Sequence, residues 1–182
     1  LMRIDLLFAG SKLGAKWSAV VPDIGQNGQM DVHAFRHPLL IDSGAVANDF
    51  CLDDGKPVLI LSGPNAGGKT IALKSFGVLA LMTQLGVPIP AAPGARVDFF
   101  EQIVADIGDA QTVEGLSTFS GHLLRIRAFL ESSPHLHRLV LLDEIGMGTD
   151  PSQGAALAQA VVEQLVEQRC RVALTTHFTK LK

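Results

Sequence analysis

A glycine-rich segment, Gly63-Pro-Asn-Ala-Gly-Gly-Lys-Thr70, has the residue types that most clearly predict chemistry in this chain. It fits the pattern G-x-x-x-x-G-K-[ST], in which glycines let backbone N–H groups surround phosphate oxygens. Lys69 would reach the β- and γ-phosphates, and the Thr70 hydroxyl would ligate Mg²⁺. A chance Gly-rich turn is the alternative, but average glycine usage makes that coincidence rare. The segment predicts a Mg-ATP site that consists of Gly63, Pro64, Asn65, Ala66, Gly67, Gly68, Lys69 and Thr70, with the following Ile71.

Two further motifs each follow an apolar segment and carry side chains suited to phosphate chemistry. Asp143 would hold the metal ion, usually through water, and Glu144 would polarise the water that attacks the γ-phosphate. An apolar strand that ends in a solvated acidic turn is common, so this motif depends on the glycine-rich segment for its meaning. His177 would hydrogen-bond the γ-phosphate, although a histidine taken alone is more often a surface residue.

Short apolar segments precede these motifs, and they are typical of strands buried on both faces of a parallel sheet. The expected strands are Val58–Ser62, Arg138–Asp143 and Arg171–Thr175, with weaker candidates at Asp31–Phe35 and Arg96–Asp106. The expected helices span Leu1–Lys16, the stretch from the glycine-rich segment to Leu85, Phe119–Glu131, and Asp150 to Gln168, where Asp150 is the N-cap. Because strands alternate with helices, we expect an α/β fold with a mainly parallel sheet flanked by helices.

The composition limits the class of protein. With 182 residues, 47% of them hydrophobic and 18% charged, the chain is long enough for one globular domain. A formal net charge of -3 provides no basic surface for nucleic acid, so we do not expect this segment to be the main DNA-binding surface. Cys51 and Cys170 lie in unlike contexts, which suits a reducing cytosol. No segment has the pattern of a signal peptide or a membrane span, so we expect a cytoplasmic location and no membrane partner.

Five blocks of residues, in the same order along the chain, resemble the ATPase domain of the MutS family. The blocks are Arg36-His37-Pro38, Gly63–Thr70, Ser117-Thr-Phe119, Asp143-Glu-Ile-Gly146 with Gly148-Thr149, and Thr176-His177. Two details are more similar to a second bacterial branch, here called MutS-two, than to mismatch-repair MutS. They are Asp106-Ile-Gly-Asp109, and Gly148-Thr-Asp-Pro151 leading to Gly154-Ala-Ala-Leu157. The resemblance implies that residues 31–182 are an ABC-type P-loop ATPase domain cut at its C-terminus, and that residues 1–30 are the end of a lever helix with a linker.

The same resemblance implies a head-to-tail homodimer in which each ATP contacts both subunits. Asn65 and Lys69 would contact the terminal phosphate, whereas Ser117 would reach the ATP of the other subunit. Asp150 would lie in the loop that crosses the dimer axis. Members of the branch are linked to branched DNA, to suppression of recombination or to stalled ribosomes, and many carry a C-terminal Smr nuclease module. DNA or the ribosome would therefore be bound mainly by regions absent from this chain.

The base-binding region is where the sequence departs from the family. MutS proteins often stack an aromatic residue on adenine near an Ala-Asn pair, but this chain has Ala45-Val-Ala-Asn48 there. We expect Val46 to pack on the base and His37 to lie in the nucleotide site. Three alternatives remain: mismatch-repair MutS, an ATP-dependent dimerisation module with negligible turnover, and a small-molecule kinase. Asp150-Pro151 argues against mismatch-repair MutS, and Glu144 argues against a dimerisation module without turnover. A kinase is disfavoured because the sequence shows no lid region with phosphate-binding arginines.

Overall fold

The computed structural model describes residues 2–64, 67–108, 118–131 and 137–178. By its internal contacts the chain divides into two compact units. One unit joins residues 1–56 to residues 75–100, and the other joins residues 57–74 to residues 101–182. Helix α2 (Lys69–Gln84) begins in the second unit and continues in the first.

The first unit contains a four-stranded sheet in the order β1-β5-β2-β3. Its strands are β1 (Asp23–Ile24), β2 (Met30–Phe35), β3 (Asn48–Leu52) and β5 (Arg96–Val97). β2 pairs antiparallel with both β3 and β5, whereas β1 pairs parallel with β5. Three aromatic rings join this sheet to α2, because the Phe50 ring lies 6.2 Å from Phe35 and 5.0 Å from Phe76.

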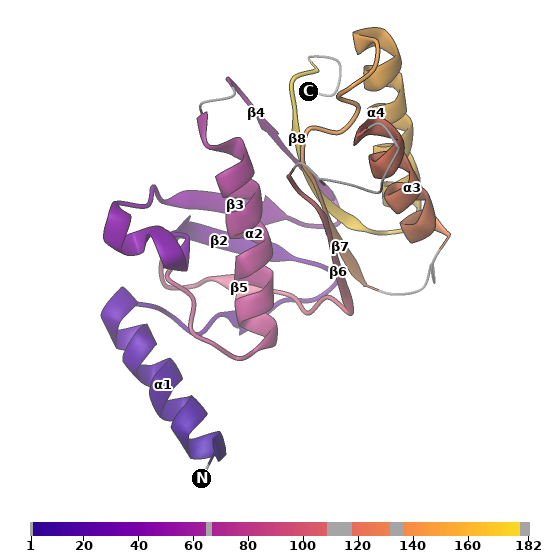
Figure 1. The fold of residues 1–182 in the computed structure, drawn as a ribbon. Coiled ribbons are helices and arrows are strands. Elements are labelled where there is room, and N and C mark those ends of the chain that lie inside the picture. Colours follow the sequence, from indigo (N-terminus) through magenta and orange to yellow (C-terminus); the bar gives the residue numbers. More distant parts are fainter. Residues whose placement is uncertain (1, 65–66, 109–117, 132–136, 179–182) are drawn as a thin grey trace. The chain divides into compact units, whose positions relative to one another are not determined.

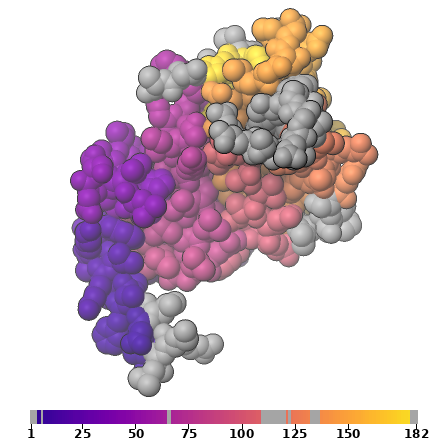
Figure 2. Space-filling view, viewed as in Figure 1, coloured from indigo at the N-terminus to yellow at the C-terminus, as the bar shows by residue number. Residues whose placement is uncertain are grey.

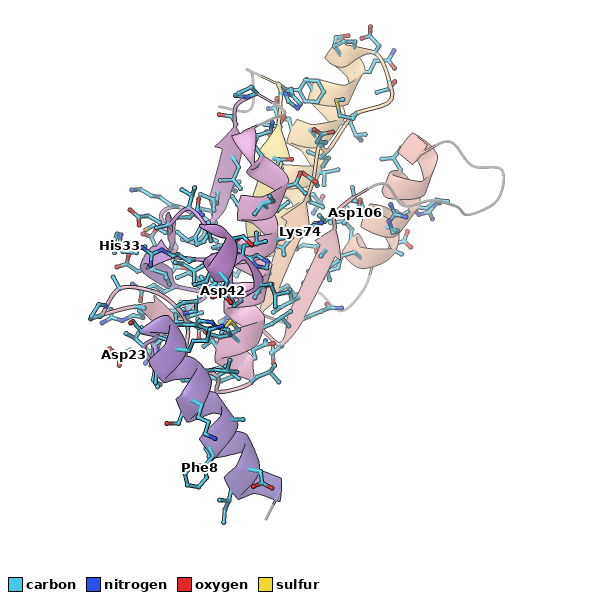
Figure 3. All side chains as sticks on the ribbon, turned by 60° about the vertical axis from the view of Figure 1, so that its left-hand side comes forward. Phe8, Asp23, His33, Asp42, Lys74 and Asp106 are labelled. Carbon is cyan, nitrogen blue, oxygen red and sulfur yellow. The ribbon has the colours of Figure 1, made fainter. Side chains whose placement is uncertain are left out.

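Two helices of the first unit lie at its surface. Helix α1 (Met2–Trp17) exposes Leu7 and Phe8, and Phe8 points outward in Figure 3. The indigo atoms of α1 are exposed in Figure 2. The 3₁₀ helix η1 (Pro38–Ser43) follows β2 and ends at Gly44, whose φ is 81°. Within the described part of the chain, no helix has the length and apolar character needed to cross a membrane.

The second unit contains a fully parallel sheet in the order β4-β8-β7-β6. Its strands are β4 (Val58–Ser62), β6 (Gln102–Asp106), β7 (Arg138–Leu142) and β8 (Arg171–Thr176). Helices α3 (Thr118–Leu130) and α4 (Pro151–Glu167) lie beside the strands (Figure 1). Their apolar residues, such as Ile126 and Val161, share one buried cluster with Val140 and Val172 of the sheet. This arrangement confirms the expected α/β fold with a parallel sheet flanked by helices.

The prediction of a single strand over Arg96–Asp106 is wrong. The segment is divided into β5 and β6, which belong to different sheets. Asp98 explains the break, because its buried carboxylate accepts hydrogen bonds from the backbone N–H groups of Gly28 and Phe99. A side chain that bonds neighbouring backbone in this way competes with the ladder of a sheet. The mixed sheet of the first unit is a further difference from the prediction, because no strand was predicted at β1 or β3.

Two glycines allow the turn after β7 to approach the first turns of α4. A Cβ atom placed on Gly154 would lie 2.3 Å from the carbonyl oxygen of Gly146 and 3.0 Å from the Phe178 ring. We therefore expect Gly154→Ala to lower the free energy of unfolding by about 1–3 kcal/mol, because backbone and ring must both move. Urea denaturation followed by circular dichroism would measure this change.

Gly121→Ala is the matched control, since Gly121 also lies in a helix of the second unit. The nearest atom to its added Cβ would be Arg125 Nη1, at 3.9 Å. Among the described residues this is an ordinary contact with the end of a flexible side chain, so alanine should raise stability by about 0.5–1 kcal/mol through its helix propensity. A stabilising effect of both substitutions would show that the Gly146–Gly154 contact is not tightly packed.

Candidate functional site

The predicted motif residues emerge where three parallel strands end at the same edge of the second unit's sheet. β4 leads into the glycine-rich loop, β7 leads to Asp143 and Glu144, and β8 leads to His177. Since β8 lies between β4 and β7, His177 emerges between the glycine-rich loop and the two acidic residues. The carboxyl ends of parallel strands are the usual ligand-binding edge of open α/β sheets.

Two residues of the glycine-rich loop contact the Lys69 side chain. The Lys69 ammonium donates hydrogen bonds to the carbonyl oxygens of Gly63, at 2.8 Å, and Pro64, at 2.9 Å. Gly68 has a φ of 74°, a left-handed conformation that favours glycine. Lys69 then begins α2, whose N-terminus is a favourable place for an anion. The described part of the loop thus brings the Lys69 ammonium and the N-terminus of α2 together, while Asn65 and Ala66 lie outside the described residues.

The two predicted metal ligands are in direct contact. The Thr70 hydroxyl donates a hydrogen bond to Asp143 Oδ2 at 2.9 Å. A hydroxyl and a carboxylate are the oxygen ligands that Mg²⁺ accepts, usually together with water and phosphate oxygens. These residues therefore fit a Mg²⁺ ion bound with a nucleotide.

Glu144 and His177 form a second pair beside this contact. Glu144 Oε1 lies 3.2 Å from His177 Nε2, and both side chains are partly exposed. Glu144 has a φ of 52°, an uncommon value for a residue other than glycine. The pair places a carboxylate and an imidazole next to the predicted metal ligands, in reach of solvent.

A hollow of about 350 Å³ adjoins these residues. Its polar wall includes Thr70, Asp143 and Glu144, and its apolar residues come from α3, α4 and the turn after β7. Asp106, at the end of β6 and labelled in Figure 3, also lines the hollow. It forms an ion pair with Arg125 of α3 at 2.8 Å.

The structure does not test the remaining predicted residues as nucleotide contacts. His37 and Val46 belong to the first unit, where His37 precedes η1 and Val46 is 79% exposed. Ile71 follows Thr70 in α2 and is half exposed, and Ser117 lies outside the described residues. Their contacts with a nucleotide therefore stay predictions.

The helix start predicted at Asp150 is confirmed. The Asp150 carboxylate accepts hydrogen bonds from the backbone N–H groups of Ser152, at 2.9 Å, and Gln153, at 3.3 Å. The Ser152 hydroxyl also donates to it, and these bonds hold the pKa of Asp150 below its ordinary value. Pro151 occupies the first helical position.

The sequence analysis did not select Thr175, which contacts both acidic residues. Its hydroxyl donates to Asp143 Oδ1 and accepts from the Glu144 backbone N–H. The available signal was a polar residue that directly follows the apolar residues 172–174 in a strand that is buried along its whole length. A buried hydroxyl needs a hydrogen-bond partner, so such a residue indicates a specific contact.

Comparison with known proteins identifies the family to which the chain belongs. Residues 59–182 match the protein family described as MutS domain V. Proteins named Endonuclease MutS2 are similar over nearly the whole chain: those of Listeria welshimeri and Enterococcus faecalis are 44% identical over 181 residues, and that of Clostridium novyi is 40% identical over 183. The chain covers 23% of the length of each of these relatives. Because the family match takes in the glycine-rich loop, both acidic residues and His177, the chain belongs to the MutS family as a domain V, and its sequence is of the MutS-two branch.

Proposed function

We propose that this chain binds Mg-ATP and hydrolyses it as an ABC-type ATPase domain of a MutS-two-like protein. The contact between Thr70 and Asp143, next to a loop that encloses Lys69, is the observation that carries the proposal. It joins a predicted phosphate-binding loop to a predicted metal ligand on another strand. Lys69 would bind the β- and γ-phosphates, and Thr70 and Asp143 would hold the Mg²⁺ that neutralises phosphate charge. Glu144 would orient and polarise the attacking water, and His177 would contact the γ-phosphate.

The pairing of Glu144 with His177 supports hydrolysis over a role of ATP as a dimer-binding ligand alone. A module that only clamps ATP does not need a carboxylate held at 3.2 Å from an imidazole in reach of water.

We further propose that the active state is a head-to-tail homodimer. The hydrolytic site of one subunit would be completed by Ser117 of the other, so turnover should rise with protein concentration. The whole protein would act on branched DNA or a related nucleic-acid assembly, through parts outside this chain. The net charge of -3 supports DNA binding through other parts of the protein. A segment with this charge would gain little free energy from the release of counterions from DNA. The two free thiols, Cys51 and Cys170, suit a cytoplasmic protein.

Mixing two inactive variants tests the composite site. Ser117→Ala and Lys69→Ala should each have little turnover alone, because each lacks one part of every site. A mixed dimer regains one complete site, formed by Lys69 of one chain and Ser117 of the other. We therefore expect the mixture to recover part of the wild-type turnover, measured as phosphate release.

A mixture of Lys69→Ala with Glu144→Gln is the matched control. Both residues belong to the same subunit's part of the site, so no mixed dimer contains a complete site and no recovery is expected. Recovery in neither mixture, together with turnover per chain that is independent of concentration, would contradict the composite site.

A further inference from the structure

Thr175 is a buried residue to which the proposed mechanism gives no role. It is the next-to-last residue of β8, is 0% exposed, and pairs through its backbone with Leu61 of β4. Its hydroxyl donates to Asp143 Oδ1 at 2.6 Å and accepts from the Glu144 N–H at 2.8 Å. We propose that Thr175 is a positioning residue for ATP hydrolysis, fixing Asp143 and Glu144 through one hydroxyl, an inference that rests on the proposed function.

The Thr175 hydroxyl links β8 to the chain after β7 just beyond the last backbone pair of these two strands. The ladder between β7 and β8 ends at Leu142 and Leu174. Asp143 then turns its N–H to the opposite neighbour and donates to the carbonyl oxygen of Asp106 at 2.9 Å. The Thr175 side chain therefore holds the two acidic residues against β8 where the backbone ladder no longer does.

The bond to Glu144 acts on a backbone that needs support. A left-handed residue other than glycine costs about 1–2 kcal/mol and persists only where its surroundings hold it. The Glu144 N–H is held by Thr175, and the Glu144 carbonyl oxygen accepts from the Met147 N–H at 3.1 Å. With both backbone groups bonded, the side chain is directed to the position beside His177.

The bond to Asp143 sets which carboxylate oxygen faces the metal-binding hydroxyl. Thr175 occupies Oδ1, whereas Thr70 contacts Oδ2. Valine at position 175 would have nearly the same shape and strand preference but could neither donate nor accept. Asp143 could then rotate, and the Glu144 N–H would lose its acceptor.

Thr175→Val should therefore lower kcat about tenfold or more, as is usual for residues that orient ligands of a metal site. KM for ATP should change by less than about twofold, because the phosphate-binding loop is untouched. The Mg²⁺ concentration that supports half-maximal turnover should rise. Thr175→Ser keeps the hydroxyl and should restore most of the turnover.

Thr83→Val is the matched control. Thr83 is also buried, and its hydroxyl donates to the Leu79 carbonyl oxygen at 3.1 Å within α2, where it orients no site residue. It should leave kcat and the Mg²⁺ requirement unchanged although it removes a buried hydroxyl. If Thr175→Val does not fold, Thr175→Cys takes its place as the test variant, because cysteine is of similar size but forms weaker hydrogen bonds.

A double substitution separates positioning from general damage. Because Thr175 acts partly through Glu144, Thr175→Val should cause a smaller loss of turnover in the Glu144→Gln background than in the wild-type protein. Wild-type kcat in Thr175→Val, no rescue by serine, or fully additive losses would each overturn the inference while leaving the proposed ATPase function intact. Absence of ATP turnover in the wild-type protein would instead remove the proposed function itself.

Discussion

Lys69→Ala is expected to reduce ATP affinity by a hundredfold or more. Lys69 is the cation that the glycine-rich loop encloses, and its ammonium makes two charge-assisted hydrogen bonds to the loop. Bonds to charged groups are worth about 1.5–3 kcal/mol each, and about 2.7 kcal/mol corresponds to a hundredfold in affinity. Removal of this ammonium would take away both the contact to the phosphates and the support of the loop. Titration calorimetry with Mg-ATP would measure the loss.

Lys74→Ala provides the control for charge. Lys74 lies farther along the same helix and is exposed (Figure 3), so the substitution removes the same charge without touching the loop. Exposed charges contribute little, and we expect an ATP affinity within about twofold of wild type. Equal ATP affinity in Lys69→Ala and wild type would refute the assignment of the phosphate-binding loop.

Glu144→Gln is expected to retain ATP binding and to lose turnover by about a hundredfold or more, the range usual for loss of a general base. Glutamine has the same size and keeps the backbone conformation at position 144. It can still bond His177 but cannot take a proton from water. Single-turnover measurements of phosphate release, with a separate titration for ATP affinity, would distinguish the two effects.

Glu163→Gln is the corresponding control, since Glu163 is exposed on α4 and its nearest polar partner is Gln159. It should change neither affinity nor turnover. Turnover near wild type in Glu144→Gln would assign water activation to another residue. A large loss of ATP affinity would instead mean that Glu144 supports nucleotide binding.

The residues of the site that sequence analysis identified belong to local patterns. An apolar strand directly precedes both the loop at Gly63–Thr70 and the pair Asp143-Glu144. The local sequence therefore predicts which motif is present and that it lies at the end of a strand. Parallel strands bring such ends together, and the contact of Thr70 with Asp143 is the result. Patterns of strand and helix likewise located β4, β7, β8 and all the described α-helices.

The features that sequence analysis missed depend on contacts between distant segments. Thr175 has the sequence context of any polar residue in a strand, and its role arises because β8 lies between β4 and β7. The break between β5 and β6 depends on Asp98, whose carboxylate bonds the backbone of Gly28, far away in sequence. β1 has only two residues, which is too short to show the alternation by which strands are recognised.

At position 144, the residue that would make the fold most stable differs from the residue that the proposed activity needs. With a φ of 52°, this residue holds a conformation that asparagine or glycine adopts at lower energy. Replacement by either would relieve about 1 kcal/mol of strain while removing the carboxylate. The most stable version of this turn is therefore an inactive one, and a search for thermostable variants would select against the proposed catalytic residue unless activity is screened as well.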